Sequence, residues 1–137
     1  MAKFNKIDTI NLIRTTGIVP VFYNADVELT KQVVKACYDG GIRAFEFTNR
    51  GDGAHRVFKE VISFVRAECP EMAFGAGTIL DAPTAALYLQ LGADFLVSPC
   101  VLDEVIPLAN RRGVPYSPGC GTVSEIVHAM ERGCDLV

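Results

Sequence analysis

The spacing of apolar residues changes in a regular order along the chain. Short runs rich in apolar and β-branched residues alternate with longer stretches in which apolar residues recur every three or four positions. The short runs predict strands near residues 18–23, 44–50, 72–79, 95–99 and 115–118, with a last strand opening at residue 135. The longer stretches predict helices over residues 7–16, 26–39, 54–67, 82–91, 103–112 and 123–132. The chain is therefore expected to alternate strands and helices after one N-terminal helix.

Residues at the expected helix ends support these boundaries. Asp26 can cap the helix over residues 26–39, and Thr122 with Glu125 has the spacing of a capping box. Asp103 opens the helix over residues 103–112, and two arginines close it, as the helix dipole favours. Glycines stand where each helix must turn back toward a strand.

Strands separated by single helices predict parallel pairing through right-handed crossovers. A doubly wound sheet and a (β/α)8 barrel both satisfy that order. The doubly wound nucleotide-binding sheet would have a GxGxxG turn after its first strand, where this chain has Tyr23-Asn24-Ala25-Asp26. The pattern favours the barrel, because polar residues gather at the C-terminal ends of several strands. These residues are Glu46, Arg50, Thr78, Ser98 and Ser117.

The predicted strand over residues 44–50 contains the most informative side chains. Side chains alternate along a strand, so Glu46 and Arg50 share one face while Phe45 and Phe47 share the other. The phenylalanines require an apolar layer, which places the carboxylate and the guanidinium toward a separate interior. Burying these charges is unfavourable unless they are paired or used. The strand is a candidate site, and an interior salt bridge between Glu46 and Arg50 is the structural alternative.

Composition and charge fit one globular domain in a reducing compartment. Of the 137 residues, 50% are hydrophobic and 21% charged, and the formal net charge is −3. No apolar run reaches the ~20 residues of a membrane span, and the N-terminus lacks a signal-peptide pattern. The five cysteines and two histidines show no metal-ligand spacing. We therefore expect a cytoplasmic protein with no metal and no nucleic-acid or membrane partner.

The number of strand–helix units is small for a complete barrel. About five units and the start of a sixth strand fall short of the eight units, typically ~200 residues or more, that close a barrel. Residues 1–137 are thus expected to form an incomplete barrel domain without an internal linker, as the front of a longer protein. Pro20 is the local exception, because proline avoids the middle of central strands.

Five sequence blocks at the predicted strands resemble the 2-keto-3-deoxy-6-phosphogluconate aldolase family, which includes 4-hydroxy-2-oxoglutarate aldolases. The resemblance covers the whole chain, with the blocks in family order and spacing, and the family also carries a proline in its first strand. The blocks are Gly17-Ile18-Val19-Pro20-Val21, Gly40-Gly41-Ile42-Arg43-Ala44-Phe45-Glu46-Phe47-Thr48, Gly75-Ala76-Gly77-Thr78, Val97-Ser98-Pro99 and Pro118-Gly119.

The resemblance implies a (β/α)8 barrel with class I aldolase chemistry and no organic cofactor or metal. In such enzymes a lysine forms a Schiff base with a 2-keto acid. The family implies Glu46 as the catalytic proton shuttle and Arg50 and Thr78 as ligands of the substrate carboxylate. Pro99 and Pro118 are expected to shape the substrate pocket. A planar guanidinium suits a carboxylate, and a buried carboxyl group suits proton transfer.

The implied reaction cleaves 2-keto-3-deoxy-6-phosphogluconate or 4-hydroxy-2-oxoglutarate to pyruvate plus glyceraldehyde 3-phosphate or glyoxylate, as in the Entner–Doudoroff pathway. The family's Schiff-base lysine would follow Val137 directly, so the 137-residue chain alone is expected to be inactive. The family also implies a homotrimer. Two alternatives stay open: a non-catalytic truncated barrel fragment, and another barrel lyase or isomerase.

Overall fold

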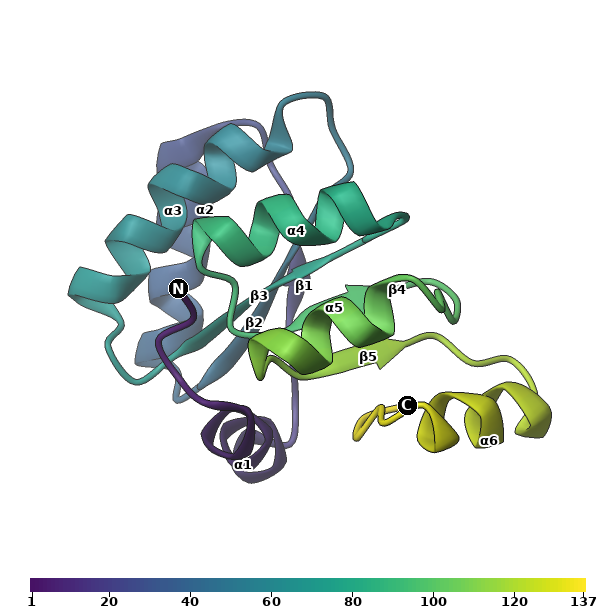
Figure 1. The fold of residues 1–137 in the computed structure, drawn as a ribbon. Helices are drawn as coiled ribbons and strands as arrows, with labels where there is room; N and C mark the ends of the chain where they lie inside the picture. The colour runs from purple at the N-terminus through teal and green to yellow at the C-terminus, as the bar shows by residue number, and fades with distance from the viewer.

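The structure, a computed structural model, describes residues 1–137 as one open sheet with helices around it (Figure 1). The strands are β1 (Val21–Phe22), β2 (Ala44–Thr48), β3 (Ala73–Gly77), β4 (Leu96–Ser98) and β5 (Tyr116–Pro118). They pair in chain order, and every pairing is parallel. The helices are α1 (Lys6–Thr16), α2 (Val27–Asp39), α3 (Ala54–Glu68), α4 (Ala82–Leu91), α5 (Val105–Arg112) and α6 (Val123–Glu131).

The predicted alternation of strands and helices is confirmed, with three informative differences. Pro20 precedes β1, so it removes no donor from the strand, and its carbonyl accepts the amide of Glu46 at 2.9 Å. Strands β2 and β3 end before Arg50 and Thr78, which both lie in the loops that follow. The predicted sixth strand is wrong. Asp135 forms an ion pair with Lys6 of α1 at 2.5 Å, and the last three residues lie against the inner face of the sheet.

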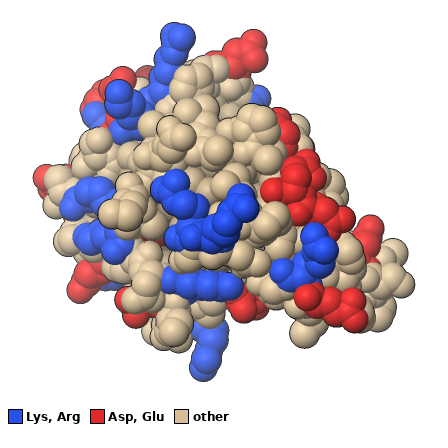
Figure 2. Space-filling view, in the orientation of Figure 1, with Lys and Arg blue, Asp and Glu red and all other residues tan.

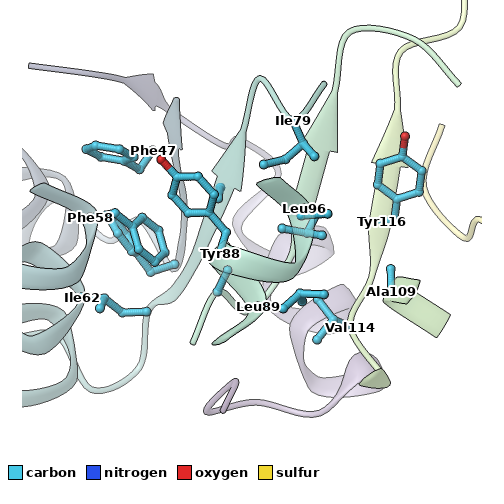
Figure 3. Packing of buried hydrophobic residues seen from close by; sticks show 14 of the residues in the cluster. Phe47, Phe58, Ile62, Ile79, Tyr88, Leu89, Leu96, Ala109, Val114 and Tyr116 are labelled. Carbon is cyan, nitrogen blue, oxygen red and sulfur yellow. The ribbon is translucent and has the colours of Figure 1, made fainter. Parts of the chain in front are cut away.

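The two faces of the sheet differ in the size of their side chains. Large aromatic residues of β2 and β3 point to the helices and pack with Phe58 of α3 and Tyr88 of α4 (Figure 3). The other face carries Ala44, Glu46 and Thr48 on β2 beside the small residues of β3. Small residues on this inner face leave room for other side chains inside the curve of the sheet.

Helix α1 covers the N-terminal end of this inner face. Its Leu12 and Ile13 pack, together with Phe4, against a buried cluster of Ala44, Ala73 and Phe95. The C-terminal end of the inner face has no such helix over it (Figure 1). We call the N-terminal ends of the strands, which α1 covers, the closed end of the sheet, and the C-terminal ends the open end.

A buried aspartate fastens the closed end. Asp94, directly before β4, is 0% exposed and accepts the backbone amides of Lys3 at 2.7 Å and Phe74 at 2.9 Å, with Phe4 at 3.4 Å. The Arg66 guanidinium of α3 donates to both Asp94 oxygens at 2.8 and 2.9 Å. This network joins the N-terminal segment, α3 and the sheet.

The expected caps form at α2 and α6, whereas α5 begins two residues later than predicted. Asp26 accepts amides of the first turn of α2, and Thr122 with Glu125 makes the predicted capping box. Helix α5 begins at Val105, whereas Asp103 contacts His128 Nε2 of α6 at 2.9 Å. The outer surface carries charges of both signs (Figure 2). No helix combines the length and apolarity needed to cross a membrane.

Candidate active site

Glu46 occupies the middle of the inner face, where the neighbouring strand leaves a space for its carboxylate. It lies at the centre of β2, and Gly77 of β3 stands diagonally beside it. A methyl group built on Gly77 would lie 1.7 Å from Glu46 Oε1. Because no side chain can approach so closely, glycine at this position is what allows the carboxylate to lie over β3.

The Glu46 carboxylate is nearly buried and has no partner. The residue is 8% exposed, and its side chain makes no hydrogen bond or salt bridge. Burial raises the pKa of Glu46, while the positive charge of Arg50 acts in the opposite direction. The interior salt bridge between these residues, the structural alternative, does not form. Glu46 is thus a nearly buried carboxyl group that is not fixed in an ion pair, which makes it a candidate functional group.

A cavity of about 470 Å³ opens in front of Glu46. Its walls are mostly apolar, and Ser117 of β5 adds a hydroxyl. The remaining lining residues come from α1, the inner face and the C-terminal segment: Ile13, Val19, Phe95, Val97, Asp135, Leu136 and Val137. Its volume falls in the range of small-molecule pockets.

Arg50 and Thr78 lie in adjacent loops at the open end of the sheet. Arg50 follows β2 and is exposed, and Thr78 follows β3. The loops meet where the Asn49 amide donates to the Gly77 carbonyl at 2.9 Å. Thr78 has a φ of 57°, the one positive φ outside glycine in the chain. A β-branched residue in this region is strained, and such strain gathers at functional sites.

Thr48 is a further candidate residue, to which sequence reasoning gave no role. It is 1% exposed on the same face as Glu46, and its hydroxyl is buried without a hydrogen-bond partner. An unpaired buried hydroxyl destabilises a protein by about 1–3 kcal/mol. Alternation along β2 already placed Thr48 between Glu46 and Arg50, which was the signal that could have identified it.

The prolines and Ser98 lie apart from the cavity. Pro99 is exposed after β4, and Pro118 is buried at the end of β5 beside Ser98. The Ser98 hydroxyl bonds to Tyr116 and to the Cys100 carbonyl. It therefore lies on the helix side, and the expected gathering of polar groups includes Ser117 but not Ser98.

Lysines and metal-binding clusters are both missing from this cavity. The five lysines of the chain are Lys3, Lys6, Lys31, Lys35 and Lys59, and none lines it. No group of three His, Cys, Asp or Glu side chains is arranged to hold a metal ion. The chemistry present is that of the unpaired Glu46 carboxyl group, the Asp135 carboxylate paired with Lys6, nearby hydroxyls and a guanidinium.

Comparisons with known proteins in sequence and in structure point to one family. The family model "KDPG and KHG aldolase" matches residues 9–137. The chain is 34% identical over 122 residues to the KHG/KDPG aldolase of Escherichia coli, covering 88% of the chain and 55% of that protein. It is 36% identical over 134 residues to the 2-dehydro-3-deoxy-phosphogluconate aldolase of Pseudomonas aeruginosa, covering 96% and 57%.

The solved structures show the same fold. The 2-keto-3-deoxy-6-phosphogluconate aldolase of Zymomonas mobilis, solved with 3-phosphoglycerate, superposes with a TM-score of 0.81 at 25% identity. That comparison covers 93% of the chain and 59% of the solved one. The chain spans 55 to 60% of the length of the curated relatives it matches, so its five-stranded sheet is part of a (β/α)8 barrel. It belongs to the KDPG and KHG aldolase family.

Proposed function

We propose that this chain carries the proton-transferring and carboxylate-binding part of a class I aldolase, an aldehyde-lyase that releases pyruvate from a 2-keto acid. The substrates would be 2-keto-3-deoxy-6-phosphogluconate, 4-hydroxy-2-oxoglutarate or both, giving glyceraldehyde 3-phosphate or glyoxylate as the second product. The curated relatives are named as aldolases of this kind, which supports the proposal.

The unpaired Glu46 carboxyl group is the observation that carries the proposal. Lysine attack on the C2 ketone gives a carbinolamine, whose hydroxyl leaves as water after taking a proton. The resulting iminium accepts the electrons of the C3–C4 bond as the C4 hydroxyl loses its proton and C4 leaves as the aldehyde. C3 then takes a proton to become the pyruvate methyl, and water hydrolyses the imine to release pyruvate and the free lysine. Glu46 would supply and recover these protons, and a raised pKa suits that role because both forms are then accessible.

Arg50 and Thr78 would hold the substrate carboxylate at the open end of the strands. The guanidinium offers a planar pair of donors, and the strained Thr78 brings a hydroxyl to the adjoining loop. Thr48 is a third candidate, because its hydroxyl lacks a partner. Pro99 and Pro118 stay predictions as pocket-shaping residues.

The Schiff-base lysine is proposed to follow Val137, which lines the cavity with Glu46. Assembly as a homotrimer and a cytoplasmic location belong to the same proposal. The 137-residue chain should therefore bind pyruvate without reacting with it. Borohydride treatment in the presence of pyruvate should leave its mass unchanged, and a stable adduct on one of its lysines would contradict the proposed position of the nucleophile.

Pyruvate binding tests the proposed function directly. In an NMR titration of the chain, pyruvate should shift the amide signals of Glu46, Thr48 and Thr78, and methyl pyruvate, which lacks the charge, should bind more weakly. Arg50→Gln should remove this preference for the charged ligand, whereas Arg56→Gln, an exposed arginine on α3, should keep it. Equal binding of both ligands by the unmodified chain would favour the non-catalytic alternative.

A further inference from the structure

The loop between β2 and α3, residues 49–53, determines where the Arg50 guanidinium can reach. It contains two glycines in five residues, a composition that gives the backbone wide freedom. The structure nevertheless fixes it through contacts on both sides of Arg50. These contacts come from Gly77 of β3, Tyr88 of α4 and Tyr23.

On the N-terminal side of Arg50, Asn49 is held by two neighbours. Its backbone amide donates to the Gly77 carbonyl of β3 at 2.9 Å, and its side-chain oxygen accepts the Tyr88 hydroxyl of α4 at 2.9 Å. Tyr88 is 0% exposed, and its ring packs edge-on against Phe58 with centroids 4.9 Å apart. Figure 3 shows the Tyr88 ring beside Phe47 and Phe58. The helical layer thus holds the Tyr88 hydroxyl firmly.

The C-terminal side of Arg50 is confined by Tyr23. A methyl group built on Gly51 would lie 2.1 Å from the Tyr23 hydroxyl, so the ring lies directly over the loop. The Arg50 amide itself donates to the Thr48 carbonyl at 3.0 Å, which turns the chain sharply after β2. Arg50 is therefore exposed in its side chain but fixed at both flanking residues.

We propose that Tyr88 and Asn49 are positioning residues, whose hydrogen bond sets the reach of Arg50 toward the carboxylate of the substrate. This inference rests on the proposed function of Arg50. The bond has a single direction, because the Asn49 side-chain oxygen can only accept and the Tyr88 hydroxyl therefore donates. Arg50 also opposes the effect of burial on the pKa of Glu46, so its position influences the carboxyl group.

Tyr88→Phe removes the bond and leaves the ring in the aromatic cluster. With Arg50 less well oriented, the Kd of the chain for pyruvate should rise about five- to tenfold, while that for methyl pyruvate changes little. Tyr38→Phe is the matched control, because the Tyr38 hydroxyl contacts only the exposed Glu71, at 3.4 Å. It should leave both affinities unchanged.

Asn49→Leu tests the other partner of the same bond. If Tyr88 and Asn49 act together, the double variant should bind pyruvate no more weakly than either single variant. Independent roles would instead multiply the two losses, and that result would overturn the proposal.

The Glu46 carboxyl titration, followed by 13C NMR without ligand, separates this inference from the proposed function. Loosening Arg50 should raise the pKa of Glu46 in Tyr88→Phe above that of the unmodified chain, and leave it unchanged in Tyr38→Phe. Unchanged pyruvate affinity and unchanged titration in Tyr88→Phe would overturn the inference. If the unmodified chain bound no pyruvate, the proposed function would fail, and the titration alone would decide whether Tyr88 positions Arg50.

Discussion

The two buried carboxyl groups of the sheet, those of Asp94 and Glu46, differ in their hydrogen-bond partners. At the closed end, Asp94 has backbone amides and a guanidinium around its carboxylate. In the middle of the inner face Glu46 has no partner, and the Thr48 hydroxyl at the C-terminal end of β2 is buried alone, as is the hydroxyl of Thr16 at the end of α1. Buried polar groups in folded proteins normally form hydrogen bonds, so a buried group without a partner is a candidate for a functional role.

Strain follows the same division. Thr78, the residue with an unfavourable φ, follows β3 at the open end, whereas the closed end is covered by α1 and its apolar side chains. In barrels of this kind, stability is concentrated at the N-terminal ends of the strands and chemistry at the C-terminal ends. The Asp94 network and the strained Thr78 thus lie at opposite ends of the strands of one sheet.

Asp94→Ala should have the largest effect on stability. It leaves Arg66 and several amides without their acceptor, and breaking a buried pair of this kind destabilises by about 3–5 kcal/mol. Urea unfolding followed by circular dichroism measures the loss. Asp103→Ala is the control, because the contacts of Asp103 with His128 and Arg132 are exposed, and it should lower the free energy of unfolding by about 0–1 kcal/mol. Similar losses in the free energy of unfolding for both variants would show that Asp94 stabilises the chain no more than an exposed aspartate does.

Gly77→Ala should disturb the position of the Glu46 carboxylate directly. The added methyl group must displace the Glu46 carboxylate, and overpacking of this sort destabilises by about 1–3 kcal/mol. Pyruvate affinity should fall with it. At Gly121 an added methyl group would have ordinary contact, 3.6 Å from Glu125, so Gly121→Ala should be near neutral. Unchanged pyruvate binding in Gly77→Ala would argue against the position of Glu46.

Two threonine-to-valine variants compare a bonded hydroxyl with an unbonded one. Thr30 is as buried as Thr48, but its hydroxyl donates to the Asp26 carbonyl at 2.8 Å. Thr30→Val should destabilise by about 1 kcal/mol, whereas Thr48→Val should be neutral or stabilising by up to about 1 kcal/mol. Thermal unfolding of both variants gives the comparison. A clear loss of stability in Thr48→Val would mean that its hydroxyl has a partner in solution.

The smallest expected effect is a change in how stability depends on pH. The pKa of Glu46 is raised in the folded chain, so between its ordinary and raised values the folded state binds more protons than the unfolded state. Stability contributed by this group therefore falls as pH rises through that window. Glu46→Gln should remove the fall and gain stability relative to the unmodified chain above the window. Parallel pH profiles for the two proteins would contradict this expectation.

The alternation of strands and helices could be predicted because each element has its own spacing of apolar residues, which neighbouring residues reveal. The phenylalanines of β2, the cap at Asp26 and the capping box at Thr122 all depend on nearby residues, and all form as expected. The Asp94 network went unpredicted because its partners, Lys3 and Arg66, lie far away in sequence. No periodicity connects such residues before the fold brings them together.

Sequence reasoning could place Glu46 in the fold, but not the geometry around it. Alternation along β2 places Glu46 on the inner face, and the structure agrees. The same rule wrongly predicted that Arg50 continues the strand. The chain turns after Thr48, where the Arg50 amide donates to the Thr48 carbonyl. The strain at Thr78 and the space over Gly77 depend on backbone angles and on a neighbouring strand.

The titration of Glu46 tests the central claim most directly, with Glu125 as an internal reference. Hydrogen bonds from Gly121 and Thr122 lower the pKa of the exposed Glu125, whereas burial raises that of Glu46. In 13C NMR of the side-chain carboxyl groups, Glu46 should titrate above the ordinary value for glutamate and Glu125 below it. If Glu46 titrated at or below Glu125, its carboxylate would be satisfied in the folded chain, and the account of an unpartnered proton-transfer group would be wrong.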